Sequence, residues 1–225
     1  MDSVRQKGDV ISQSAPSGPG FWPTFEGGPF LFHDVTMLIF SVTFRPDFVA
    51  RTLPSDLKVS EGATGGFEFL IARRGHLPVP FSATTIWFDL ASPCGDLVAP
   101  RFAAARFASH SLAGDPGVVV AQTRFCEDVQ LMSAELALQG RSILRAALLR
   151  RRSGFPAAGV TTYLGGKLQH GAWQVVPWAA TLWDAEVGEL EVLAPSFAEF
   201  TPLTVFGATL GTEAALTLGI ASRTA

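Results

Sequence analysis

The stretch "GGFEFLIA", residues 65–72, places one carboxylate, Glu68, within a run of aromatic and aliphatic residues. If this stretch is a strand, its side chains alternate between two faces, so Glu68 shares a face with Leu70 and Ala72. A carboxyl group buried among apolar side chains has a raised pKa and can act as a general acid or base near neutral pH. Glu68 is therefore the candidate catalytic residue. Periodicity alone favours the alternative, a carboxylate on a solvated strand face.

Further polar and aromatic residues could complete a site around Glu68. The candidates for binding a substrate are His33, Trp87, Arg106 and Arg124. Carboxylates in otherwise apolar segments give three weaker candidates, Asp34, Asp89 and Glu135, although amphipathic strands have the same pattern. Arg124 in "AQTRFCED" could bind a substrate carboxylate through two parallel hydrogen bonds. A salt bridge from Arg124 to Glu127 or Asp128 is the preferred alternative.

Standard signatures of nucleophiles, cofactors and metals are missing from the sequence. It contains no G-x-S-x-G, G-x-x-x-x-G-K-[ST], G-x-G-x-x-G or H-E-x-x-H motif. The four histidines are widely separated and the two cysteines form no metal-binding pattern. We therefore expect neither a cofactor nor a metal. Only three lysines occur, and Lys58 and Lys167 lie beside turn residues, which favours solvated amines over a buried nucleophile.

The composition is that of a folded protein with a large core. Of 225 residues, 48% are hydrophobic and 16% are charged, and 18 are phenylalanine. The net charge of −3 and the scattered basic residues argue against a nucleic-acid partner. Apolar stretches are too short for a membrane span. We expect a mobile leader over residues 1–20, rich in Ser, Gly and Pro, and a single cytoplasmic domain over residues 21–225.

The elements that must position Glu68 are predicted to be mainly β-strands. Turn signals recur at short intervals between apolar segments such as "TMLIFSVTF", "FSATTIWFDL" and "WQVVPWAATLW". This spacing is typical of an antiparallel β-barrel or sandwich. Two short helices are expected, one in "PDFVARTLP" and one over residues 102–113, for which a strand remains the alternative.

Two segments carry a resemblance to a known family. The amino-terminal segment that ends in "GGFEFLIA" resembles acetoacetate decarboxylase and its relatives, and so does the carboxy-terminal run "ELEVLAPSFAEFTPLTVFGATLG". The positions that match in order and spacing are Gly28-Pro29-Phe30, Phe32-His33, Leu53-Pro54, Leu57 and Phe67-Glu68. The resemblance implies a β-barrel-like fold with an apolar central cavity, in a homo-oligomer. It also implies that Glu68 points into this cavity.

The sequence departs from the family at its catalytic motif. The family uses a Pro-Lys-Lys motif whose first lysine forms a Schiff base with a 3-oxo acid. The best local match is "DPGVVV", which places Gly117 and Val118 where the lysines belong, and no lysine lies between Lys58 and Lys167. A family arginine corresponds to Val35, and a second family glutamate falls near Ala83. Schiff-base decarboxylation by the family's lysine is therefore not expected.

Two functions remain open at this point. The favoured one is an acetoacetate decarboxylase-like biosynthetic enzyme that acts on a small or polyketide-like carbonyl or oxo-acid compound through the acid–base chemistry of Glu68, without a Schiff base. The reaction would be that of a lyase, dehydratase, cyclase or decarboxylase. The alternative is a non-catalytic barrel that binds or senses a hydrophobic small molecule, since pockets for such ligands are lined by apolar residues with few polar anchors.

Overall fold

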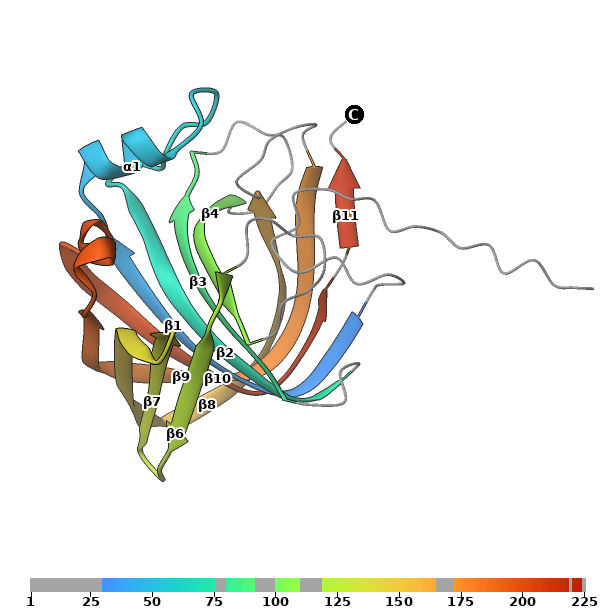
Figure 1. Cartoon of the computed structure of the whole chain (residues 1–225). Helices are drawn as coiled ribbons and strands as arrows, with labels where there is room; N and C mark the ends of the chain where they lie inside the picture. The colour runs from blue at the N-terminus through green and yellow to red at the C-terminus, as the bar shows by residue number, and fades with distance from the viewer. Residues whose placement is uncertain are drawn as a thin grey trace, which may run out of the picture.

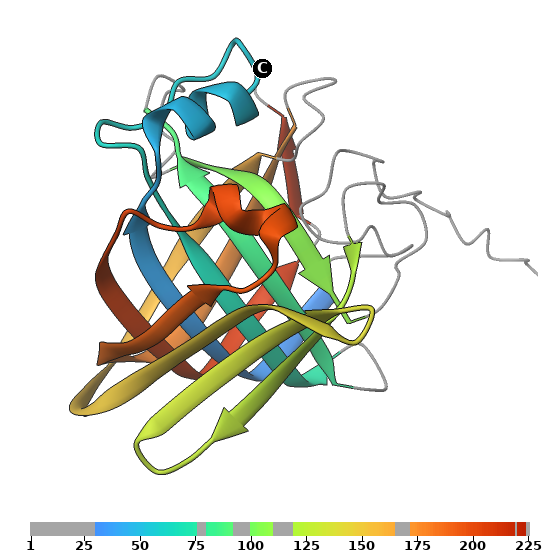
Figure 2. The ribbon, with the colours of Figure 1, turned by 60° about the vertical axis from the view of Figure 1, so that its left-hand side comes forward.

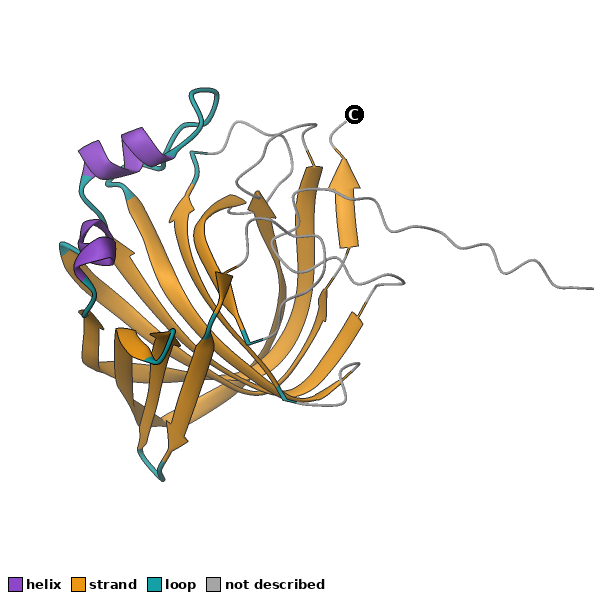
Figure 3. Cartoon of the chain, viewed as in Figure 1, coloured by secondary structure: helices purple, strands orange, loops and turns teal. Residues whose placement is uncertain are grey.

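The protein folds into one large, strongly curved β-sheet with two short helices (Figure 1, Figure 3). The computed structural model describes residues 30–75, 80–91, 100–109, 119–164, 172–218 and 220–223. The helices are α1 (Pro46–Thr52) and the 3-10 helix η1 (Pro195–Phe200). The strands are β1 (Phe30–Thr43), β2 (Thr64–Gly75), β3 (Phe81–Asp89), β4 (Pro100–Ala108), β5 (Val119–Val120), β6 (Gln122–Glu127), β7 (Leu131–Leu138), β8 (Arg141–Leu164), β9 (Ala172–Val192), β10 (Thr204–Leu218) and β11 (Ile220–Arg223).

The strand pairings close the sheet on itself. Within the described residues, β9, β10, β1, β2, β3, β4 and β8 pair in this order, and β8 pairs again with β9. All pairings are antiparallel except those of β4 with β8 and with β5. The prediction of a mainly β, barrel-like fold is confirmed, with the difference that the sheet is mixed. The parallel contact between β4 and β8 brings Arg101 beside Tyr163.

The two faces of β2 pack into different cores, as the alternation in "GGFEFLIA" predicts. Phe67 and Phe69 are fully buried in a cluster on the outer face of the ring. Leu70 and Ala72 belong to a second cluster on its inner face. Glu68 has the same parity as Leu70 and therefore faces the interior of the ring.

The outer cluster is covered by the first half of β8, the hairpin of β6 and β7, and the two helices (Figure 2). Helix α1 begins at Pro46, whose fixed φ suits the first turn, and its last turn is followed by Leu53 and Pro54. The helix predicted in this segment is confirmed. Phe48 and Phe200 pack edge-to-face, ring centroids 5.0 Å apart, and so join α1 to η1.

The helix expected over residues 102–113 is wrong for the part that the structure describes. Residues 102–108 belong to β4, and residues 110–113 lie outside the described residues. Phe102 packs in the outer cluster and Ala103 in the inner one, so this strand is covered on both faces. Burial on both sides removes the polar–apolar alternation that identifies a strand, and tertiary packing overrides the helix propensity of alanine.

Two further predictions concern the amino-terminal leader and membrane-spanning segments. The leader predicted over residues 1–20 lies outside the described residues, as does the boundary at residue 21. Among the described residues, no helix is long and apolar enough to cross a membrane.

Candidate functional site

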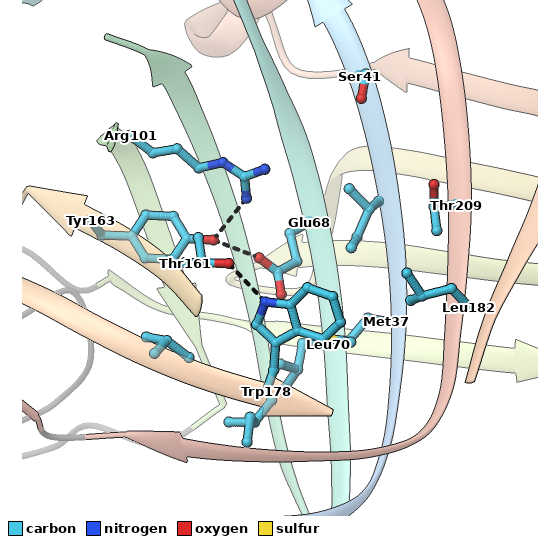
Figure 4. A pocket seen from close by; sticks show the side chains of 13 residues that line it. Met37, Ser41, Glu68, Leu70, Arg101, Thr161, Tyr163, Trp178, Leu182 and Thr209 are labelled. Atoms are coloured by element: carbon cyan, nitrogen blue, oxygen red, sulfur yellow. Dashed lines mark hydrogen bonds between the residues drawn. The ribbon is translucent and has the colours of Figure 1, made fainter. Parts of the chain in front are cut away.

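A pocket of about 250 Å³ opens inside the ring and contains Glu68 (Figure 4). Strands β1, β2, β4, β8, β9 and β10 contribute to its wall. The lining residues are Met37, Ile39, Ser41, Glu68, Leu70, Arg101, Thr161, Tyr163, Val176, Trp178, Leu182, Thr209 and Leu216. Seven of these side chains are apolar and six carry polar groups, which are the ones that can orient a ligand.

Three of the polar groups form a chain of hydrogen bonds. The guanidinium of Arg101 donates from Nη1 to the hydroxyl of Tyr163 at 3.4 Å. Tyr163 in turn donates its hydroxyl proton to Oε2 of Glu68 at 3.0 Å. Tyr163 therefore lies between the cation and the carboxylate, and the polar atoms of all three residues meet in one region of the pocket (Figure 4).

Arg101 is held in place by Trp87 and Asp89 of the neighbouring strand β3. Its guanidinium carbon lies 4.3 Å from the centre of the Trp87 ring, a favourable position for a cation over an aromatic face. Trp87 Nε1 donates to Oδ1 of Asp89 at 3.1 Å, and Arg101 Nε lies 3.8 Å from the same oxygen. This support orients the arginine before any ligand binds.

Gly66 provides the space in which the Trp87 ring lies. The two residues are direct partners in the pairing of β2 with β3. A Cβ atom on residue 66 would overlap the indole ring of Trp87 and the carbonyl oxygen of Phe40. A glycine at this position is therefore required for the arrangement that supports Arg101.

The pocket changes the proton affinities of these groups. Burial raises the pKa of the Glu68 carboxyl, although the charge of Arg101 and the hydrogen bond from Tyr163 act in the opposite direction. Burial, together with the charge of Glu68, also raises the pKa of Tyr163, so its hydroxyl stays protonated at neutral pH. Burial alone would lower the pKa of Arg101, but Tyr163, Glu68 and Asp89 raise it overall.

The residues predicted for substrate binding lie in different places. Trp87 is buried beside the site and contacts Arg101, although it does not line the pocket. Arg106 is buried in β4 but also does not line the pocket, and His33 is exposed on β1. Arg124 lies on β6 in a separate surface depression that also contains Glu135. Of these four residues, Trp87 is the one that contacts the site, through Arg101.

The three carboxylates named as weaker candidates also lie in different parts of the structure. Asp89 supports Arg101. Asp34 is exposed, and its Oδ1 lies 3.8 Å from Nη1 of Arg73. The predicted salt bridge of Arg124 with Glu127 or Asp128 is not formed, because Glu127 pairs with Arg73. Among the described residues, Arg124 has no salt bridge.

Arg101 and Tyr163 were missed in the sequence, and only Tyr163 carried a weak signal. Tyr163 is the only tyrosine of the chain. Arg101 directly precedes residues 102–113, the segment in which a helix was expected. The contact between these residues depends on parallel pairing of strands 62 positions apart, which local spacing does not reveal.

Among the residues that the structure describes, no lysine side chain lines the pocket. Lys58 is exposed in the segment after α1. Lys167, Gly117 and Val118 lie outside the described residues. Val35 and Ala83, which stand at two charged positions of the family pattern, are buried in the inner cluster. Within the part of the chain that the structure describes, no three His, Cys, Asp or Glu residues gather as metal ligands.

Comparison with known proteins identifies the fold. No protein-family model and no curated protein matches the sequence. The structure is similar to an acetoacetate decarboxylase from Legionella pneumophila, with 15% identity, a TM-score of 0.71 and coverage of 100% of this chain and 98% of that chain. MppR, an enduracididine biosynthesis enzyme solved with pyruvate, has 12% identity, a TM-score of 0.61 and coverage of 87% and 90%. An acetoacetate decarboxylase-like enzyme from Sphingomonas wittichii has 13% identity, a TM-score of 0.60 and coverage of 87% and 93%. The chain therefore has the acetoacetate decarboxylase-like fold.

Proposed function

We propose that the pocket binds a compact oxo acid and that Glu68 transfers a proton at the carbon next to its carbonyl group, without forming a Schiff base. The observation that carries this proposal is the chain from Arg101 through Tyr163 to Glu68 at an apolar cavity. A fixed cation, a protonated hydroxyl and a carboxyl of raised pKa are the groups that such a proton transfer requires.

Each polar group has a distinct role in this reaction. Arg101 binds the carboxylate of the substrate through its guanidinium. Glu68, in its ionised form, removes a proton from the carbon beside the carbonyl, and the electron pair of the broken C–H bond moves to the carbonyl oxygen. Once Glu68 holds the proton, the hydroxyl of Tyr163 donates to the enolate oxygen instead of to Glu68, and together with the positive charge of Arg101 it stabilises the enolate.

Return of the proton from Glu68 completes the reaction. Delivery to a different carbon isomerises the substrate, whereas delivery to a hydroxyl group on the neighbouring carbon lets this group leave as water and so dehydrates the substrate. Both outcomes share the same first step, so the proposal is defined by proton removal rather than by one product. A raised pKa makes Glu68 a stronger base once it is ionised.

The oxo-acid class has support from the structural neighbours. One neighbour is an acetoacetate decarboxylase, and MppR was solved with pyruvate. Both names point to small acids that carry a carbonyl group. Proton transfer without an imine is supported by the described pocket lining, which contains no lysine.

The test combines proton exchange with imine trapping. The protein is incubated with pyruvate in D2O, and deuterium incorporation at the methyl group is followed by NMR. A parallel sample is treated with borohydride and analysed by mass spectrometry. We expect exchange without a reduced adduct, and a Glu135→Gln variant, whose carboxylate lies outside the pocket, should exchange at the wild-type rate. A borohydride-stable adduct would overturn the mechanism.

A non-catalytic binding protein is the second candidate, and the apolar lining of the pocket favours it. In that case pyruvate or a more hydrophobic ligand binds, but no deuterium is incorporated. Isothermal titration calorimetry on the same sample establishes binding, which both functions require, and deuterium exchange then separates them, because only the enzyme incorporates deuterium.

A further inference from the structure

The pocket has a second polar region on the wall opposite Arg101 and Tyr163. Arg101 and Tyr163 lie at the seam between β4 and β8, and Ser41 and Thr209 lie on the paired strands β1 and β10. Around the closed sheet, three strand-to-strand steps separate β1 from β4 in one direction, and two separate β10 from β8 in the other. Figure 4 shows Glu68 between them, with Ser41 and Thr209 on the far side from Arg101.

The strand register fixes the distance between Glu68 and this region. Glu68 pairs with Ile39, and Ile39 pairs with Thr209, so the three residues form one row across the sheet. Neighbouring strands lie about 4.8 Å apart, which places the Cα atoms of Glu68 and Thr209 about 10 Å apart along the sheet. Ser41 follows Ile39 by two positions and faces the same side. A ligand anchored beside Glu68 can therefore extend over Ile39 to both hydroxyls.

The hydroxyls of Ser41 and Thr209 differ from the other polar groups of the pocket. Thr161 accepts a hydrogen bond from Trp178 Nε1 at 3.2 Å, and Glu68, Tyr163 and Arg101 bond to one another. In the described part of the chain, Ser41 and Thr209 have no side-chain hydrogen bond, yet both face the cavity. Ser41 pairs with Gly207 and Thr209 pairs with Ile39, so the two hydroxyls lie diagonally across β1 and β10 and can bind a polar group of a ligand between them.

The surroundings restrict the chemistry of that polar group. Ile39 and Leu182 make the wall beside the hydroxyls apolar. Asp184 is the direct partner of Thr209 on β9 and is exposed, so its negative charge disfavours a second carboxylate at this end. A neutral hydroxyl group, which can donate and accept, is the best match for two serine- and threonine-type hydroxyls.

We propose that Ser41 and Thr209 determine specificity by binding a hydroxyl group at the end of the substrate remote from its oxo acid. This inference rests on the proposed function, since it assumes that the oxo acid is bound beside Glu68 and Arg101. The substrate is then a compact oxo acid with an apolar middle and a terminal hydroxyl. Each hydrogen bond gained raises affinity about 3- to 10-fold.

The test uses two acids that differ only in the remote hydroxyl, benzoylformate and 4-hydroxybenzoylformate. Neither has a hydrogen on the carbon next to the carbonyl, so neither can react with Glu68 in the proposed way. Dissociation constants are measured by calorimetry for wild type and for the double variant Ser41→Ala/Thr209→Val. Thr209→Ser retains a hydroxyl, and Thr204→Val, an exposed residue of β10 outside the pocket, is the matched control.

We expect wild type, Thr204→Val and Thr209→Ser to bind the hydroxylated acid about 10-fold more tightly than benzoylformate. The double variant should bind both acids with the affinity that wild type has for benzoylformate. Equal wild-type affinities, or a preference that survives in the double variant, would overturn this inference and leave the proposed function intact. If neither acid binds to any variant while pyruvate binds to wild type, this inference is contradicted and the proposed function stands, whereas failure of pyruvate to bind contradicts the proposed function itself.

Discussion

Tyr163 donates a hydrogen bond to Glu68, 95 positions away in the sequence, and accepts one from Arg101. This places a neutral hydroxyl between a cation and a carboxylate. The hydrogen bond from Tyr163 favours the ionised form of Glu68, whereas burial favours the protonated form. The balance between these two effects sets the pH range in which Glu68 can accept a proton.

The substitution Tyr163→Phe tests this balance. It removes a hydrogen bond that stabilises ionised Glu68, so the pKa of Glu68 should rise further. The proposed base is the ionised form, so the rate of proton exchange should rise with pH. In the variant, this rise should occur at higher pH than in wild type. The maximal rate should fall about 10- to 100-fold, because the enolate loses a donor. A pH–rate profile measured by NMR with pyruvate checks both effects, and an unshifted limb would contradict the role of Tyr163.

The stability of the protein should also depend on the protonation of Glu68. Its pKa is raised above the ordinary value of 4.5, so the folded state binds the proton more tightly than the unfolded state. The stabilisation from the protonated form is complete below about pH 4.5 and is lost as the pH rises through the raised pKa. Glu68→Gln cannot ionise, so the variant does not lose stability in this way as the pH rises. Thermal melts across pH should show the variant gaining on wild type as pH rises, and a constant difference would contradict the burial of this carboxyl.

Asp89 should act as a positioning residue for Arg101. Its carboxylate accepts from Trp87 and lies 3.8 Å from Arg101 Nε. Asp89→Asn keeps an acceptor for Trp87 but removes the charge, so we expect pyruvate to bind about 3-fold more weakly. Asp89→Ala removes both contacts and should weaken binding further. Calorimetry with pyruvate and with the neutral ketone acetone tests this role. Loss of the positioning of Arg101 weakens the binding of pyruvate alone, whereas a general loss of structure weakens the binding of both ligands.

The packing of Trp87 on Gly66 should be essential for stability and for the site. Gly66→Ala adds a Cβ that overlaps the Trp87 ring and the backbone of Phe40. We expect the free energy of unfolding to fall by about 1–3 kcal/mol, with weaker pyruvate binding because Arg101 loses its support. Gly207→Ala is the control, since its added Cβ makes only an ordinary contact, 3.6 Å from Ser41 Cβ. The free energy of unfolding is measured with denaturant for both variants. An equal decrease in the two would contradict this role of Gly66.

The part of the site that lies on one strand could be predicted from the sequence. The alternation in "GGFEFLIA" separates Phe67 and Phe69 from Glu68 and Leu70, and the structure places these two sets on opposite faces of β2. Alternation does not reveal which face encloses a pocket. The family resemblance supplied that expectation for Glu68.

The rest of the site could not be predicted, because it depends on contacts between distant strands. Arg101 and Tyr163 meet through the parallel pairing of β4 and β8. Both strands are buried on two sides at this point, so neither has a polar–apolar pattern that points to a site. His33 and Arg124 stand out as polar residues in apolar segments, but an exposed position on a curved sheet gives the same pattern.

The most direct test of the central claim is the rate of deuterium incorporation into pyruvate by Glu68→Gln compared with wild type and Glu135→Gln. Glutamine preserves the size of the side chain and its acceptor for Tyr163, but it cannot take up a proton from carbon. We predict that Glu68→Gln binds pyruvate and exchanges its methyl protons at least about 100-fold more slowly, while Glu135→Gln matches wild type. Exchange by Glu68→Gln at the wild-type rate would show that Glu68 is not the base.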